Sequence, residues 1–79
     1  MIIEDYRHVS CGGDPFNFLM SSIKSIQIDM KPDDTVKIMI MDDKYPYTDK
    51  TFLSIAKFCK LTLASIERTN GEVHLTMKK

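Results

Sequence analysis

Residues 5–20 read DYRHVSCGGDPFNFLM, and this stretch decides the fold because a strand-like segment gives way to a helix start within it. The segment at residues 2–9 is short, contains Ile, Tyr and Val, and is followed by Gly12-Gly13, which favours a strand and then a turn. Asp14 is a preferred residue type at a helix N-cap. Pro15 suits the first helical position, where its missing N–H costs nothing. The stretch therefore predicts a strand, a turn and a helix that begins at Pro15.

The predicted helix continues to about Asp29 or Met30. Its apolar residues recur at helical spacing, as Phe16, Leu19, Met20, Ile23 and Ile26 or Gln27. Lys31-Pro32 ends it, because a proline disfavours helical backbone at the residue before it.

Four more elements follow, the last two joined by a turn. In the segment TVKIMIM at residues 35–41, Val36, Ile38 and Ile40 are expected to point to one face of a strand. Because Lys37 is the single charged side chain of the segment, the pattern predicts an interior strand. Residues 50–60 place apolar side chains three and four apart, behind a helix cap at Thr48 or Asp49. Asn70-Gly71 is a strong hairpin signal, because both residue types tolerate positive φ, and it predicts two final strands. Along the first of these, one face is expected to carry Leu61, Leu63, Ser65 and Glu67.

The element order is therefore β-α-β-α-β-β over a single domain, residues 1–79. Because neither helix can bury its apolar stripe alone, both should pack on one face of a four-stranded mixed sheet. This is an α/β chain in the broad sense, with the two-layer sandwich of the α+β class. The first two strands are joined through a helix and are expected to be parallel, whereas the last two form an antiparallel hairpin. The opposite sheet face is expected to be partly exposed or covered by a partner.

Composition narrows the function classes. The 79 residues include 43% hydrophobic and 28% charged residues, which is ordinary for one globular domain. Eleven basic and eleven acidic side chains balance, which argues against direct nucleic-acid binding. No apolar run approaches the ~20 residues of a membrane span, and the amino terminus lacks the pattern of a secretory signal. We expect a cytoplasmic protein.

Cys11 is the main candidate for chemistry. The predicted order places it where the first strand ends and the first helix begins, and helix N-termini stabilise anions such as a thiolate or a persulfide. Gly12-Gly13 can offer backbone N–H groups to such an anion, and Arg7 and His8 can add positive charge. Cys59, in contrast, continues an apolar helical stripe and is expected to be buried and inert.

A wider pattern accompanies this cysteine and consists of Asp5, Arg7, Cys11, Asp42-Asp43 and Phe58-Cys59. It resembles the SirA/TusA-like sulfur-carrier family of small βαβαββ proteins, whose signature is Asp-x-Arg-Gly-x-x-Cys-Pro-x-Pro. The chain departs from that signature at His8, which replaces glycine, and in CGGDP, which stands in place of CPxP. The resemblance implies a sulfur-carrier or sulfurtransferase-like activity with a persulfide on Cys11. It also implies a cysteine desulfurase or rhodanese-like donor and a downstream acceptor, for example in RNA thiolation.

Other interpretations stay open beside this one. The altered CGGDP motif also fits a non-catalytic protein-binding or regulatory module that retains the fold. A metal site is not expected, because zinc needs about four ligands and the chain has no second Cys/His pair. No cofactor motif is present. Asp42-Asp43 are expected to cap a loop rather than to act as catalytic carboxylates, and the aromatic residues Tyr45 and Tyr47 are expected to anchor their loop on the core.

Overall fold

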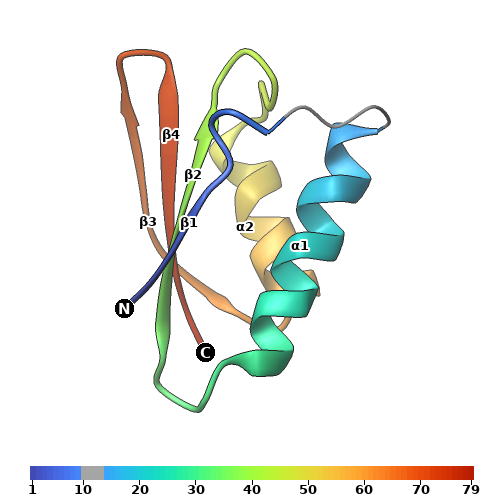
Figure 1. Cartoon of the computed structure of the whole chain (residues 1–79), viewed down its shortest axis with the longest axis vertical. Helices are drawn as coiled ribbons and strands as arrows, with labels where there is room; N and C mark the ends of the chain where they lie inside the picture. Colours follow the sequence, from blue (N-terminus) through green and yellow to red (C-terminus); the bar gives the residue numbers. More distant parts are fainter. Residues whose placement is uncertain (10–13) are drawn as a thin grey trace.

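Two helices cover one face of a four-stranded sheet in the computed structural model of the chain (Figure 1). The structure describes residues 1–9 and 14–79. The elements, in chain order, are β1 (Ile2–Asp5), α1 (Pro15–Asp29), β2 (Thr35–Met41), α2 (Asp49–Phe58), β3 (Thr62–Thr69) and β4 (Glu72–Lys78). The predicted order and the mixed two-layer architecture are confirmed.

The sheet has the strand order β1-β2-β4-β3. β1 and β2 are parallel, as expected for strands joined through a helix, and the other two pairs are antiparallel. The hairpin between β3 and β4 turns at Asn70, with φ 50°, and Gly71, with φ 78°. Two consecutive positive φ values characterise the type I′ turn that the Asn-Gly pair predicts.

The core lies between the sheet and the helices. The two central strands alternate, and their inward positions are fully buried: Val36, Ile38, Ile40, Val73, Leu75 and Met77. The helices cover them with Leu19, Ile23, Phe52, Ile55 and Ala56. Tyr45, from the loop before α2, is also buried, which confirms that this loop is anchored on the core. Burial of this apolar surface is the main force that holds the two layers together.

Both helix starts are capped by side chains. The Asp14 carboxylate accepts a hydrogen bond of 2.9 Å from the backbone N–H of Phe16, with Pro15 in the first turn, as predicted. Of the two candidate caps for α2, the structure selects Thr48, whose hydroxyl oxygen lies 3.3 Å from the backbone nitrogen of Thr51. Among the described residues, no helix is long and apolar enough to cross a membrane.

Two expectations about strands were wrong. β1 ends at Asp5 instead of near Val9, because the chain turns at Arg7 and His8 and the Val9 N–H donates to the Tyr6 carbonyl at 3.3 Å.

The regular alternation expected along β3 also fails. The pairing with β4 shifts between Leu63 and Ser65, so Ala64 is an extra residue of a bulge. A bulge moves every following side chain to the other face. Leu63 and Ile66, three residues apart, therefore both pack against the core.

Candidate functional site

The predicted site is the junction between β1 and α1, and the structure describes its two flanks. On one side His8 is exposed in the turn after β1. On the other side Asp14 and Pro15 open α1, as predicted. Cys11 and Gly12-Gly13, the predicted nucleophile and its backbone donors, lie outside the described residues.

Arg7, the second predicted supporting residue, is held by carboxylates on the face of the sheet opposite the helices. Its Nε and Nη2 atoms donate to Asp5 at 2.9 and 2.8 Å, and Nη1 donates to Glu72 at 3.2 Å. Asp5 lies level with Met39 of β2, and Met39 lies level with His74 of β4. Arg7 thus reaches across β2 and links the turn after β1 to β4.

His74 extends this cluster, since its Nε2 atom lies 2.9 Å from a carboxylate oxygen of Glu72. We call Asp5, Arg7, Glu72 and His74 the sheet-face network. Hydrogen bonds from the Arg7 side chain and from its backbone N–H hold the pKa of Asp5 well below its usual range. His74 and then Arg7 lower the pKa of Glu72, while Asp5 and then Glu72 raise the pKa of Arg7.

Sequence reasoning did not assign Glu72 and His74 to this cluster. The signal that could have found them is alternation, since Glu72 and His74 flank Val73 and point away from the core. The alternation identifies this cluster only when the strand order is known, because that order places β4 beside β2. The spacing of residues in the sequence does not reveal the strand order.

A second charged cluster anchors the start of α2. Arg68 of β3 pairs with Asp42 at 3.1 Å and Asp49 at 2.8 Å, and it donates to the Tyr47 carbonyl at 3.0 Å. Its guanidinium carbon also lies 5.6 Å from the centre of the Phe52 ring. The Asp42 carboxylate, which was expected to cap its loop, is thus an ion-pair partner of β3.

Cys59 is buried beneath α1, as predicted. Its Sγ atom lies 3.9 Å from the backbone carbonyl oxygen of Met20, and its side chain belongs to the core. Burial raises the pKa of this thiol, while the positive charge of Lys24 acts in the opposite direction. A raised pKa and little access to solvent make this sulfur a poor nucleophile at neutral pH.

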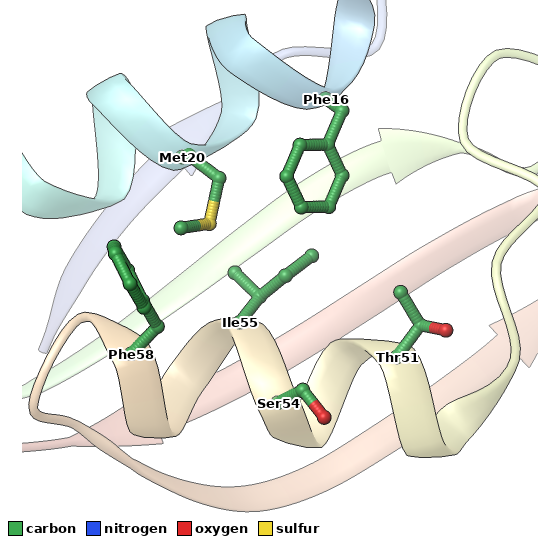
Figure 2. A pocket seen from close by; sticks show the side chains of 6 residues that line it. All are labelled: Phe16, Met20, Thr51, Ser54, Ile55 and Phe58. Carbon is green, nitrogen blue, oxygen red and sulfur yellow. The ribbon is translucent and has the colours of Figure 1, made fainter.

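An apolar groove runs between the two helices, with a volume of about 290 Å³. In Figure 2, Phe16 and Met20 of α1 face Ile55 and Phe58 of α2 across it; its lining is Phe16, Met20, Thr51, Ser54, Ile55 and Phe58.

Aromatic contacts connect the groove to the loop before α2. The Phe16 ring makes an edge contact with Tyr47 at 5.9 Å, and Tyr47 in turn contacts Phe52 at 5.8 Å. Phe58 is 62% exposed and the Lys24 ammonium lies 4.5 Å from its ring centre.

A third feature is a polar cleft between β1 and α1, with a volume of about 440 Å³. Its lining includes Glu4, Tyr6, Ser21, Ser25 and Asp29. Partial burial raises the pKa of Tyr6. Within residues 1–9 and 14–79, no group of three or more His, Cys, Asp or Glu side chains is arranged to hold a metal ion.

Comparison with known proteins adds no further identification: no family model, no curated protein and no solved structure matches the chain. The resemblance to the SirA/TusA-like family therefore stays a prediction from the sequence.

Proposed function

We propose that the protein is a sulfur carrier that holds a persulfide on Cys11. One observation carries the proposal: the chain passes from the end of a parallel strand, through the segment that contains Cys11, into a helix capped by Asp14. Ligands and reactive groups collect at such junctions, because the free backbone N–H groups and the positive end of the helix dipole favour an anion.

The proposed loading step is an exchange of one sulfur–sulfur bond for another. The Cys11 thiolate attacks the terminal sulfur of a persulfide on a donor protein, which is a cysteine desulfurase or a rhodanese-like protein. A bond forms between that sulfur and Cys11, the sulfur–sulfur bond of the donor breaks, and the donor leaves as a thiolate. A downstream acceptor receives the sulfur by a second exchange, for example on a route to RNA thiolation. We place this relay in the cytoplasm, where thiols stay reduced.

The supporting residues have different roles in this proposal. Gly12-Gly13 would offer backbone N–H groups to the persulfide, and the exposed His8 would add positive charge when it is protonated. Arg7 already pairs with Asp5 and Glu72. It would therefore act as a positioning residue that holds the turn from which the Cys11 segment starts.

Sulfur loading tests the proposal directly. The purified protein is incubated with a cysteine desulfurase and cysteine, and its intact mass is then measured. We expect a gain of one sulfur atom that a reductant removes, that Cys11→Ser abolishes and that Cys59→Ala leaves unchanged. The Cys59→Ala protein is the matched control because it removes the other thiol. A protein that reacts rapidly with an alkylating agent at Cys11 but never gains sulfur would contradict the proposal.

The exposed apolar groove favours a second candidate, a non-catalytic protein-binding module, since exposed apolar patches often mark protein interfaces. The two candidates differ in what Cys11→Ser does in cells. A sulfur carrier loses its relay function in that variant, whereas a binding module keeps both its partner and its cellular effect.

A further inference from the structure

We propose that the groove between α1 and α2 binds an acidic amphipathic helix of a partner protein. The surface concerned consists of the groove lining together with four exposed lysines on or just after the two helices, and we call it the helix-face surface. The inference does not depend on sulfur chemistry at Cys11, because it rests on described residues of the two helices alone.

The apolar part of this surface supplies the anchoring sites. Phe16 and Phe58 both line the groove, and they are 38% and 62% exposed to solvent. Ile28 of α1 is 75% exposed and lines a smaller hollow that adjoins the groove through Phe58. Burial of apolar surface contributes roughly 25 cal/mol per Å², so covering these side chains favours association.

The shape of the groove fits a helix. Thr51 and Phe58 line the same side of it and are seven residues apart on α2, which corresponds to about 10 Å along a helix axis. The apolar anchors of a helix bound in a groove recur at i, i+4 and i+7, which spans the same length. The Phe16 ring that lines the groove is held in place by its edge contact with Tyr47 at 5.9 Å.

The positive charge of the lysines on this surface indicates that the bound helix is acidic. Four exposed lysines lie on α1, on α2 and just after α2: Lys24, Lys50, Lys57 and Lys60. Lys24 lies over the Phe58 ring, and Lys24 and Lys60 line the hollow that adjoins the groove. Lys50 and Lys57, seven residues apart, project from the same side of α2.

These lysines differ from the two arginines of the chain in their partners. Within the described residues, no acidic side chain forms an ion pair with any of the four, whereas Arg7 and Arg68 each pair with two carboxylates. An apolar groove whose adjoining hollow carries the unpaired Lys24 and Lys60 complements an apolar stripe flanked by Glu and Asp.

The same charges argue against other occupants. A second copy of this chain would bring two sets of lysines together, which costs free energy. A nucleic acid would satisfy the lysines but would leave the apolar lining uncovered. A flat anionic membrane would cover the exposed rings but would not fill a concave groove.

A designed peptide tests the proposal on the full chain. The probe is a synthetic helix of about 16 residues, with Leu at i, i+4 and i+7 and Glu on both flanks of that stripe. Binding is measured by isothermal titration calorimetry and mapped by amide chemical shifts. We expect a dissociation constant below about 100 μM, with the largest shifts on the helix-face surface and none around the sheet-face network. A peptide with the same composition in scrambled order should bind at least about tenfold more weakly, a difference of about 1.4 kcal/mol.

Variants of the chain separate the apolar contribution from the charge contribution. Phe58→Ser should weaken binding by about tenfold or more, because it removes an anchoring side chain. The matched control is Leu53→Ser, since Leu53 is exposed on the same helix but does not line the groove, and this variant should bind as the parent does. Lys24→Glu combined with Lys57→Glu should abolish the preference for the acidic peptide over one in which Lys replaces Glu.

Several results would overturn the proposal. These are no binding at about 1 mM peptide, equal binding of the acidic and basic peptides, and equal effects of the Phe58 and Leu53 substitutions. Self-association of the chain that Phe58→Ser removes would identify a second copy as the occupant instead. Binding to anionic vesicles or to RNA in the absence of peptide binding would assign the surface to a membrane or to a nucleic acid.

Discussion

Phe52 and Phe58 lie six residues apart on α2 and meet opposite surroundings. Phe52 is fully buried, and the Arg68 guanidinium over its ring is held by Asp42 and Asp49. Phe58 is 62% exposed, and the Lys24 ammonium over its ring forms no ion pair with an acidic side chain in the described part of the chain.

Six residues turn a helix by about 240°, so the two rings point to different sides of α2. The first ring and its cation are satisfied within the fold. The second ring and its cation are available to a partner. The comparison shows that one helix can place two pairs of an aromatic ring and a cation in opposite surroundings, one held within the fold and one exposed.

The largest expected effect is on stability. Phe52→Ala should lower the free energy of unfolding by about 3–5 kcal/mol, because it removes a fully buried ring and leaves a cavity. Phe58→Ala, the same substitution on the same helix, should change it by about 0.5 kcal/mol or less. Urea denaturation of both variants measures the difference. Similar losses of unfolding free energy in the two variants would contradict the expected difference between the buried and the exposed ring.

A smaller effect is expected at the cations. Arg68→Gln removes two ion pairs and should cost about 1 kcal/mol, an amount that decreases as salt is added, because the pairs are partly exposed. Lys24→Gln should cost almost nothing, since Lys24 has no acidic partner among the described residues. Thermal unfolding at low and high salt tests this, and an equal loss in the two variants would contradict the expected difference between the paired and the unpaired cation.

The smallest effect is expected on the opposite face of the sheet and depends on pH. Because the pKa values of Asp5 and Glu72 are lowered in the folded protein, their stabilising contribution is complete above their ordinary values of 3.8 and 4.5. It is lost progressively as the pH falls below those values.

Arg7→Met should reduce this loss, because it removes a hydrogen-bond donor shared by both carboxylates. Melting temperatures at pH 7 and at lower pH, down to about 3, test the effect. An equal decrease in the parent and in Arg7→Met would show that Arg7 does not control the two carboxylates.

Local signals in the sequence predicted most of the fold. The spacing of apolar residues, the Asp14-Pro15 helix start and the Asn70-Gly71 turn each depend on residues close together in the chain. The bulge in β3 was not predictable in this way. Ala64 and Ser65 are small residues that fit either face of a strand, so the alternation gives no sign of an extra residue there.

The surfaces were harder to predict than the elements. The sheet-face network requires the strand order, because Arg7 and Glu72 are 65 positions apart in the sequence. The groove requires the placement of α1 against α2, which no local pattern contains. Cys11 differs from both of these features, because its proposed role was inferred from the sequence and the structure describes only the flanks of its segment.

The bulge at Ala64 has a consequence for the behaviour of the protein at high concentration. β3 lies at the edge of the sheet, and an exposed edge strand can pair with an edge strand of another molecule and begin fibril growth. The extra residue interrupts the row of outward N–H and C=O groups. An incoming strand therefore faces two short segments that differ in hydrogen-bonding register. Deletion of Ala64 would restore a continuous edge and should make the chain more prone to assemble into β-rich aggregates.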